Sequence, residues 1–448
     1  MTDTLDLIVI GAGMAGINAA KKCSKAGWST AIVDELPYGG TCALRGCDPK
    51  KMLRAGAEAV EAARRLNGKG VAGGTRIDWP ALMKHKESFT DPVPENMATG
   101  LKKAGVQTLH GRARFIAEDR IEVEGHGEIA FRHALIATGA TPRPLDFPGA
   151  AKLIDSTEFL NLAELPRRIV FVGGGYVSFE FAHIAARAGA EVTILDRGAR
   201  QLKKFDPDLV EMVMDRSRAA GIEIVTEAVP ERIEDADGAH RVIYRKASES
   251  HTIEADLVVH GAGRVPATEH LDLAVAGIET ENGGVKVTPW LQSTSNPRIY
   301  AAGDAAATPG KPLTPVAVFE GKIAASNMLK DKRTEPDYTG VPSVVFTIPE
   351  LTRVGLLEEE ARERGEVDVS FNDTSGWFSQ MRLGESHAGT KIITDKQGKI
   401  LGAHMFGPDY AELINVFSLA IKLGLTAAQV KSMPAAYPTG ASDIGSMF

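Results

Sequence analysis

Two segments of the sequence share one order of apolar and polar positions: an apolar run, a glycine-rich turn, a helix-compatible stretch, and a second apolar run followed or closed by aspartate. In the first segment the runs are Leu7–Ile10 and Thr30–Val33, and the stretch between them is Ile17–Ala26. Short apolar runs of this kind predict buried strands, and a span of about 30 residues is typical of a βαβ unit. The same order recurs about 160 residues later, in the runs Ile169–Val172 and Glu191–Leu195. The sequence therefore predicts two separate dinucleotide-binding domains.

The first glycine-rich turn has the spacing that suits a pyrophosphate. Gly11 allows a tight turn, Gly13 lets the backbone approach the phosphates, and Gly16 lets the following helix pack closely on the strand. The helix N-terminus then faces the phosphates with its partial positive charge. Asp34, which follows the second run, is placed to accept hydrogen bonds from a ribose hydroxyl.

The second turn keeps Gly173 and Gly175 but has Ser178 in the third glycine position, where a small side chain still allows close packing. Asp196 ends its second strand, where a carboxylate favours NAD(H). Four cations follow this carboxylate: Arg197, Arg200, Lys203 and Lys204. Such a cluster suits the extra phosphate of NADP(H), and because four cations outnumber one anion we expect NADPH, with NADH as the alternative. For Arg200 and Lys204, a solvated surface position is an equally good interpretation.

From Pro342 onward the pattern changes. Short β-type runs alternate with helical stretches such as Leu357–Arg364 and Ala411–Leu423. This predicts a separate α+β domain. Before it, a loop rich in proline and glycine at positions 139–149 marks a crossing between domains.

Composition and charge exclude several classes of protein. The chain has 448 residues, 44% of them hydrophobic, so about three domains with sizeable cores are expected. A net charge of -7 provides no basic footprint for nucleic acid. No uncharged stretch is long enough to span a bilayer, and no signal peptide is expected. With only three cysteines, a disulfide-stapled secreted scaffold is excluded and a reducing compartment, the cytoplasm, is expected.

Two of the three cysteines, Cys42 and Cys47, lie between glycines in the segment Gly39–Lys51. Four intervening residues would suit a metal site, but zinc needs four ligands and no second cysteine pair exists, so no metal site is predicted. A redox-active dithiol/disulfide fits better, and Lys50 with a helix start after Pro49 would favour a thiolate. Two inert buried cysteines are the remaining alternative. The third cysteine, Cys23, lies within a helical stretch and is expected to be a buried spectator.

At this point the chain resembles the class I flavoprotein (pyridine nucleotide) disulfide reductases, a family that includes glutathione reductase, dihydrolipoamide dehydrogenase and mercuric reductase. The resemblance covers nearly the whole chain. It rests on the two turns, on the cysteine segment, and on five further motifs: Ala137-Thr138-Gly139, Gly263-Arg264-x-Pro266, Ala302-Gly303-Asp304, Leu313-Thr314-Pro315-Val316-Ala317 and Val345-Phe346-Thr347-x-Pro349-Glu350.

The resemblance implies FAD and NAD(P)H as cofactors and an α/β fold of the glutathione-reductase type. It implies an FAD domain over residues 1–150, an NAD(P) domain over 151–272, a segment completing the FAD domain over 273–340, and a C-terminal dimerisation domain over 341–448. The partner subunit of a homodimer would complete each active site. The implied cofactor-binding residues are Gly11, Gly13, Gly16, Asp34, Gly40, Thr41, Thr138, Gly139, Gly303, Asp304, Thr314, Pro315, Gly173, Gly175, Tyr176, Asp196, Arg197, Lys203, Gly263 and Arg264.

The resemblance also assigns roles to the redox residues. Cys47 matches the charge-transfer thiol next to the flavin, and Cys42 matches the interchange thiol nearer the substrate. Lys50 and Glu180 match a buried pair beside the flavin ring, and Tyr176 resembles the aromatic lid that nicotinamide displaces.

The chain departs from the family near its C-terminus. Thiol-disulfide reductases carry His-Pro-Thr-x-x-Glu there, whereas this chain has Tyr437 in the place of the histidine and Ser442 in the place of the glutamate. A general acid–base is worth ~10²–10⁴-fold in rate, and a phenol with a pKa of ~10 replaces imidazole poorly at neutral pH. Tyrosine at this position resembles mercuric reductase, but the chain lacks that enzyme's C-terminal cysteine pair.

Three hypotheses follow. The first is a reductase acting on a substrate that needs no histidine: Hg²⁺ or another soft metal ion, a small sulfur electrophile such as hypothiocyanous acid, or a quinone. The second is a conventional disulfide reductase with an unusual base, Asp443 or His404. The third is a non-catalytic flavoprotein within a larger complex. Partners are expected to be a small molecule or metal ion and a second copy of the chain, with no nucleic acid and no membrane.

Overall fold

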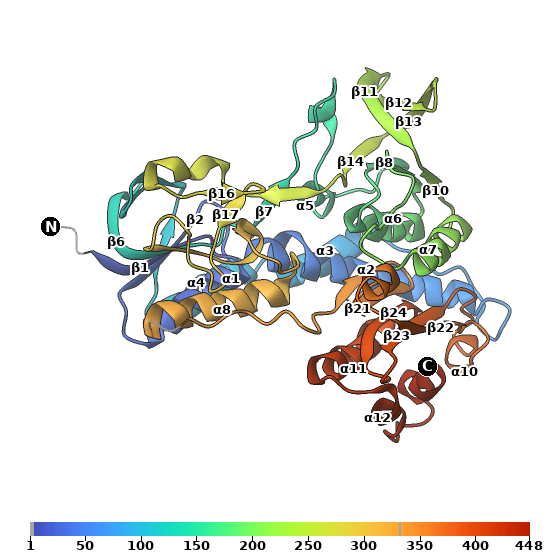
Figure 1. Ribbon diagram of the computed structural model, residues 1–448. Helices are drawn as coiled ribbons and strands as arrows, with labels where there is room; N and C mark the ends of the chain where they lie inside the picture. Colours follow the sequence, from blue (N-terminus) through green and yellow to red (C-terminus); the bar gives the residue numbers. More distant parts are fainter. Residues whose placement is uncertain (1–3, 331–332) are drawn as a thin grey trace. The chain divides into compact units, whose positions relative to one another are not determined.

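The computed structural model describes residues 4–330 and 333–448, which fall into two compact units (Figure 1). Within those ranges the first unit comprises residues up to 51, 84–143 and 264–338, and the second comprises 52–83, 144–263 and 339–448. Each unit therefore gathers three separated stretches of the chain. The division into domains at residues 150, 272 and 340 stays a prediction.

The first unit contains a sheet in the strand order β3-β2-β1-β6-β5-β4, with β18 also paired to β6. The parallel strands are β1 (Leu5–Ile10), β2 (Thr30–Asp34), β3 (Gln107–His110), β6 (Gly127–Ile136) and β18 (Ile299–Ala301), and the antiparallel ones are β4 (Ala113–Ala117) and β5 (Arg120–Val123). Leu7, Ile8 and Val9 of β1 are completely buried, because a parallel strand covered on both faces needs apolar residues at every position. The first predicted βαβ unit is confirmed.

Helices α1 (Met14–Lys25) and α8 (Thr314–Lys330) lie side by side in this unit (Figure 1). They approach closely because α8 has no side chain at Gly321, where an added Cβ would lie 2.3 Å from the carbonyl oxygen of Ala15. Helix α1 begins at Met14, three residues before the predicted start, directly after the glycine-rich turn. The first unit also holds α4 (Val93–Lys103) and the short strands β7 (Ala140–Pro142), β15 (Arg264–Pro266), β16 (Thr280–Glu281), β17 (Gly284–Lys286) and β19 (Ala306–Ala307).

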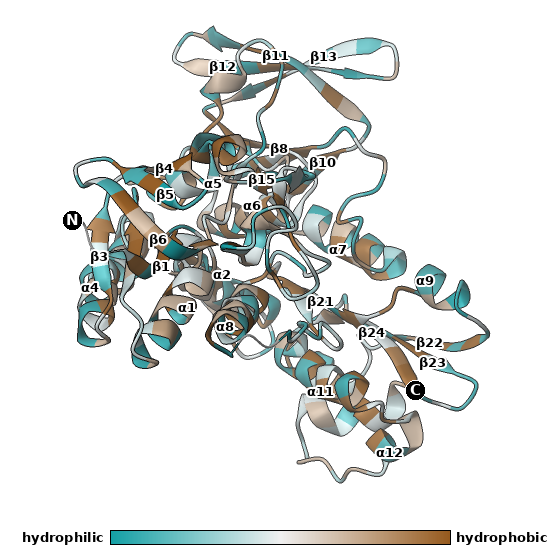
Figure 2. Cartoon of the chain, turned by 60° about the vertical axis from the view of Figure 1, so that its left-hand side comes forward, coloured by the Kyte–Doolittle hydropathy of each residue, from teal (hydrophilic) through white to brown (hydrophobic). Residues whose placement is uncertain are grey.

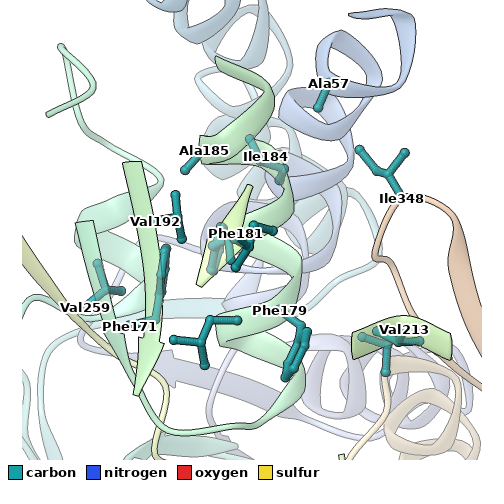
Figure 3. Packing of buried hydrophobic residues seen from close by; sticks show 14 of the residues in the cluster. Ala57, Phe171, Phe179, Phe181, Ile184, Ala185, Val192, Val213, Val259 and Ile348 are labelled. Carbon is teal, nitrogen blue, oxygen red and sulfur yellow. The ribbon is translucent and has the colours of Figure 1, made fainter. Parts of the chain in front are cut away.

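The second unit contains a parallel sheet in the order β10-β9-β8-β14. Its strands are β8 (Arg168–Val172), β9 (Glu191–Leu195), β10 (Ile222–Val225) and β14 (Leu257–His260), and its helices include α6 (Tyr176–Ala188) and α7 (Pro207–Ala219). Phe171 on β8 and Phe179 and Phe181 on α6 are almost fully buried and form part of one apolar cluster (Figure 3). This packing holds α6 against the sheet and so positions the second glycine-rich turn.

The C-terminal part of the second unit is a five-stranded antiparallel sheet in the order β20-β21-β24-β23-β22. Helix α11 (Tyr410–Leu423) contacts β21 and β24 and carries both hydrophobic and hydrophilic positions (Figure 2). Strands β20 (Ser343–Val345), β21 (Glu350–Gly355), β22 (Val367–Asp373), β23 (Gly389–Asp395) and β24 (Ile400–Gly407) make up the sheet. The predicted α+β region is confirmed, although its helix α9 (Glu358–Arg362) is shorter than predicted.

The remaining elements of the second unit are mostly short. They are a three-stranded sheet of β11 (Ala228–Ala236), β12 (Ala239–Lys246) and β13 (Glu249–Ala255), and the helices α5 (Ser156–Phe159), α10 (Phe378–Met381) and α12 (Ala427–Lys431). Helices α2 (Cys47–Arg65) and α3 (Trp79–Thr90) each have residues in both units. Across the described ranges, no helix combines the length and the apolar character that a membrane crossing requires.

Candidate active site

The first glycine-rich turn is packed against the segment that carries the two cysteines. Gly13 and Gly40 face each other so closely that a Cβ on Gly40 would lie 2.5 Å from the Cα of Gly13, and Gly40 adopts a φ of 65°. The N–H of Gly39 donates to the carbonyl oxygen of Ala12 at 3.1 Å. The nucleotide turn and the cysteine segment are therefore held at one position in the first unit.

The residues around this turn fit a bound dinucleotide. The carboxylate of Asp34 accepts hydrogen bonds from the N–H of Ala12 at 2.7 Å and of Leu36 at 2.8 Å, which fixes the turn, and burial raises the pKa of Asp34. The hydroxyl of Thr138, after β6, is buried and has no hydrogen-bond partner among the described residues. Buried polar atoms are rarely left unpaired, so this hydroxyl is suited to a bound cofactor. We conclude that the first unit fits FAD.

Sequence reasoning missed Glu320, a fully buried residue of α8. Its carboxylate accepts hydrogen bonds from the N–H of Gly303 at 2.7 Å, from the hydroxyl of Thr308 at 2.8 Å and from that of Tyr338 at 2.6 Å. Burial raises the pKa of Glu320 and also that of the neighbouring Asp304. Glu320 therefore fixes the turn that presents Asp304, and the sequence signal was that Glu320 is the one acidic residue of helix α8.

The predicted dithiol is assembled at the start of α2. Cys42 is half-buried in a turn of π-helix over Thr41–Arg45, and Cys47 is the exposed first residue of α2. Both are free thiols here, and the Cys47 sulfur lies 3.6 Å from the hydroxyl of Thr314, the first residue of α8. A hydrogen bond with Cys47 raises the pKa of the Cys42 thiol, and burial raises it further.

This geometry separates the two sulfurs chemically. The helix begins at Cys47 and not after Pro49, because the N–H of Lys50 already donates to the carbonyl oxygen of Gly46. A helix N-terminus favours negative charge, so this position would stabilise a thiolate at Cys47, whereas the raised pKa of Cys42 favours its protonated form. The separate roles of the two cysteines stay predictions. Cys23, by contrast, is completely buried, and burial raises its pKa to about 12.

The other predicted redox residues lie in different units. Lys50 is buried in the first unit, and Glu180 is buried on α6 of the second, where its carboxylate accepts from the N–H of Phe346 at 2.8 Å. Tyr176, the first residue of α6, is 47% exposed. The pairing of Lys50 with Glu180 and the lid role of Tyr176 stay predictions.

The serine in the second glycine-rich turn is accommodated by a glycine elsewhere. Ser178 is completely buried on α6, and a Cβ added to Gly261 would lie 1.9 Å from its Oγ. Gly261 follows β14, whose strand neighbours β8. The Ser178 side chain therefore fits because Gly261, after the neighbouring strand β14, has no side chain. The sequence shows two glycines at this point, in Gly261-Ala262-Gly263 directly before Arg264, but it does not show that Gly261 faces Ser178.

Arg264 itself lies in the first unit on β15, where its guanidinium donates to the carbonyl oxygen of Ala140. Its charge lowers the pKa of Asp304, opposing the larger effect of burial. Gly139, which precedes the paired strand β7, accepts from the N–H of Ala267 at 2.9 Å. These contacts bring Thr138, Arg264 and Asp304 into one neighbourhood of the first unit.

The specificity residues of the second unit occupy the loop between β9 and α7. The carboxylate of Asp196 accepts from the side-chain amide of Gln201 at 3.2 Å, and a Cβ on Gly174 would lie 2.4 Å from it. The cations Arg197, Arg200, Lys203 and Lys204 are all exposed, although Arg200 donates to the carbonyl oxygen of Phe205 at 2.7 Å. The loop thus offers a cluster of cations beside one partly engaged carboxylate.

Of the candidate acid–base residues, His404 does not fit the role. It is completely buried on β24, its Nε2 donates to the carbonyl oxygen of Leu356 at 2.8 Å, and burial lowers its pKa to about 3. Tyr437 is 82% exposed, in the loop between α12 and the final 3-10 helix. Asp443 accepts from the hydroxyl of Ser379 at 2.5 Å.

Comparison with known proteins identifies the family of both parts. The chain matches the model of the pyridine nucleotide-disulphide oxidoreductases over residues 5–321 and that of their dimerisation domain over residues 341–447. It is 31% identical to dihydrolipoyl dehydrogenase of Geobacillus stearothermophilus, over 97% of this chain and 93% of that one. It is 34% identical to glutathione reductase of Pisum sativum (99% and 82% covered) and 31% identical to mercuric reductase of Bacillus cereus (98% and 70% covered).

Solved structures give the same result. The HOCl-induced flavoprotein disulfide reductase RclA from Escherichia coli superimposes with a TM-score of 0.89 at 28% identity, covering 99% of both chains. A Cu(II) complex of the same protein matches with a TM-score of 0.89 at 29% identity, again covering 99% of both chains. The fold class and the resemblance predicted from the sequence are confirmed.

The contact between Ser178 and Gly261 predicts a compensating pair of substitutions. Gly261→Ala alone should lower the free energy of unfolding by about 1–3 kcal/mol, because the new methyl group collides with the serine side chain. Adding Ser178→Gly removes the colliding atoms and should recover most of the lost free energy of unfolding. Thermal unfolding of the single and double variants measures this, and a double variant as unstable as Gly261→Ala would show that the clash lies elsewhere.

Removal of the Glu320 carboxylate should weaken flavin retention. Glu320→Ala frees the N–H of Gly303, and we expect FAD affinity to fall by about 10- to 100-fold, the cost of losing buried hydrogen bonds to a charged group. Flavin fluorescence after dialysis measures the free fraction. The exposed Glu335 provides the matched control Glu335→Ala, and equal retention in both variants would contradict the role of Glu320.

Proposed function

The chain belongs to the pyridine nucleotide-disulphide oxidoreductase family, and we propose that it is an NADPH-dependent reductase that uses Cys42 and Cys47 on a small oxidant that requires no histidine. The family uses FAD and NAD(P)H, and the chain is a flavoprotein disulfide oxidoreductase of class I. The observation that carries the proposal is the cysteine pair at the start of α2: two sulfurs in contact, one half-buried and one at a helix N-terminus.

Bound FAD would carry the electron pair from NAD(P)H to the disulfide. The residues of the chain then prepare the resulting dithiol for the substrate. The start of α2 favours the thiolate at Cys47, the raised pKa of Cys42 keeps a proton on the second sulfur, and Thr314 provides a hydroxyl beside Cys47. The pair therefore holds one nucleophile and one proton, the set needed for a two-electron oxidation.

Hypothiocyanous acid illustrates why no imidazole is needed. One sulfur attacks the substrate sulfur and displaces hydroxide, which takes the proton of the other thiol and leaves as water. The second sulfur then displaces thiocyanate and closes the disulfide, so the two cysteines lose two electrons in total. Thiocyanate is a weak base and leaves without protonation, unlike the thiolate that a conventional disulfide releases.

Metal ions are the second candidate substrate class. Two Cu²⁺ ions would each take one electron from the thiolate–thiol pair, with release of the remaining thiol proton and formation of the disulfide, and Hg²⁺ would bind the two sulfurs before reduction. The proposal is supported by Tyr437 in the place of the histidine and by the similarity to a protein described as HOCl-induced, for which a structure of a Cu(II) complex is known. Quinones remain substrates that the flavin would reduce directly.

We also propose a homodimer in which Tyr437 faces the partner's site. The C-terminal region matches the family's dimerisation domain, and it exposes several large apolar side chains. The most exposed are Phe378, Met381, Leu419, Leu423 and Tyr437, each between 59% and 82% exposed. Burial of such side chains in a second copy is the ordinary way to remove them from water.

A substrate panel tests the proposal. With NADPH as donor, kcat/KM for hypothiocyanous acid or Cu²⁺ should exceed that for glutathione disulfide or lipoamide by at least ~10²-fold, the worth of the missing acid–base pair. Installing that pair with Tyr437→His and Ser442→Glu should raise turnover of the two disulfides by ~10-fold or more while leaving hypothiocyanous acid nearly unaffected.

The variant Tyr437→Phe is the control that removes the phenol hydroxyl alone and keeps the ring. Rapid turnover of glutathione disulfide or lipoamide by the unmodified protein would instead support a conventional disulfide reductase. A flavin that NADPH reduces but that passes electrons to none of these substrates would support a non-catalytic flavoprotein.

A further inference from the structure

Two charged side chains of the C-terminal sheet hold the loop that carries the four exposed cations. Arg353, on β21, donates to the carbonyl oxygen of Lys204. Lys391, on β23, places its Nζ 2.9 Å from the carboxylate of Asp206 and 2.5 Å from that of Asp208. The residues contacted, Lys204, Asp206 and Asp208, lie where the loop ends and α7 begins.

Lys391 is itself tightly fixed. Its side chain is only 3% exposed, and a third carboxylate, that of Glu358, lies 3.2 Å from its Nζ. Burial alone would lower the pKa of Lys391, but its hydrogen bonds to the carboxylates, first Asp208 and then Asp206, raise it above its ordinary value. A buried charge with several charge-assisted hydrogen bonds has little freedom, so the segment that it binds is held in one place.

The sheet and α7 are also in direct contact at this point. A Cβ on Gly389, the first residue of β23, would lie 2.8 Å from the sulfur of Met212 and 3.2 Å from a methyl group of Leu209. At Gly389 the backbone of β23 therefore packs directly against the side chains of Met212 and Leu209 on α7. The ion pairs of Lys391 therefore join two elements, β23 and α7, that are already closely packed.

The other side of the loop is fixed to the nucleotide turn. The N–H of Leu202 donates to the carbonyl oxygen of Gly174 at 3.1 Å, and Gln201 links Asp196 to the carbonyl oxygen of Gly198. Between these contacts and those of the C-terminal sheet stand the exposed Lys203 and Lys204. The chain thus holds the cations between two fixed points, one in the nucleotide-binding turn and one in the C-terminal sheet.

We propose that Arg353 and Lys391 are positioning residues for nucleotide specificity: by fixing residues 204–208 they hold the cation cluster where the 2′-phosphate of NADPH binds. This inference rests on the NADPH preference in the proposed function. A lysine acts on a phosphate as a point charge, so its effect depends on where its backbone is held. Fixing the loop before binding removes part of the entropic cost of forming the site.

A purely structural role predicts a different outcome. If the contacts of Lys391 only support α7, their loss lowers thermal stability and weakens all nucleotides alike. If they position the cations, their loss weakens the ligand with a 2′-phosphate more than the ligand without one. The informative quantity is the ratio of the two affinities, not either affinity alone.

The test uses the FAD-loaded protein and two fragments of the coenzymes, adenosine 2′,5′-bisphosphate and 5′-AMP, titrated by calorimetry. The unmodified protein should bind the bisphosphate more tightly, and Lys391→Met should reduce the affinity ratio by about tenfold. Lys391→Arg, which keeps the charge, should restore most of it. The matched control is Lys396→Met, which removes an exposed lysine that follows the same strand and forms an ion pair with the exposed Asp368 at 2.7 Å.

Because Lys391→Met leaves Asp206 buried without its partner, the double variant Lys391→Met with Asp206→Asn guards against loss of folding. It removes both charges and should show the same reduced ratio with a thermal stability closer to that of the unmodified protein. An unchanged ratio in both variants would overturn the positioning role. Equal binding of the two fragments by the unmodified protein would overturn it together with the NADPH preference, while leaving the cysteine chemistry of the proposed function intact.

Discussion

The close contact of Gly13 with Gly40 is the constraint on which the site depends. One glycine belongs to the turn that receives a pyrophosphate, and the other opens the segment that carries Cys42 and Cys47. Because Gly40 has no room for a Cβ, which would lie 2.5 Å from the Cα of Gly13, the nucleotide turn and the cysteine segment lie against each other in the first unit. Asp34 and Glu320 then fix the surroundings, one through the N–H of Ala12 and the other through that of Gly303. A redox centre beside a cofactor follows from backbone packing, before any side-chain chemistry is considered.

The sequence predicted those parts of the site whose residues lie close together along the chain. The turn at Gly11–Gly16, the cysteine pair and the cation cluster after Asp196 each lie within a few residues, so their chemistry could be inferred from spacing. The roles of residues that act through tertiary contacts could not be inferred in this way. Gly261 matters because it faces Ser178, Glu320 because it reaches Gly303, and Lys391 because it reaches Asp206, and none of these pairings has a local pattern. His404 shows the reverse error, since a histidine that the sequence leaves open as a base is buried, with its pKa lowered to about 3.

The substrate class that we propose rests on what the two cysteines can do without a histidine. The start of α2 favours a thiolate at Cys47, and the raised pKa of Cys42 retains a proton there, so the pair contains what a small oxidant needs and lacks what a bulky disulfide needs. Tyr437 is consistent with this division, because a phenol can border a pocket but is a poor proton carrier at neutral pH. We propose a second copy of the chain as the neighbour of Tyr437, because the C-terminal region matches the family's dimerisation domain and exposes large apolar side chains.

The central claim, that the two cysteines form the redox centre with distinct roles, is tested most directly by anaerobic reduction with NADPH in a stopped-flow spectrometer. The unmodified protein should develop a long-wavelength absorption band from a thiolate stacked on the oxidised flavin. Cys42→Ser should keep such a band, and Cys47→Ser should lose it, with Cys23→Ser as the control that changes nothing. A band that survives in Cys47→Ser would contradict the assignment of the thiolate, and a band absent from every form of the protein would contradict the redox centre itself.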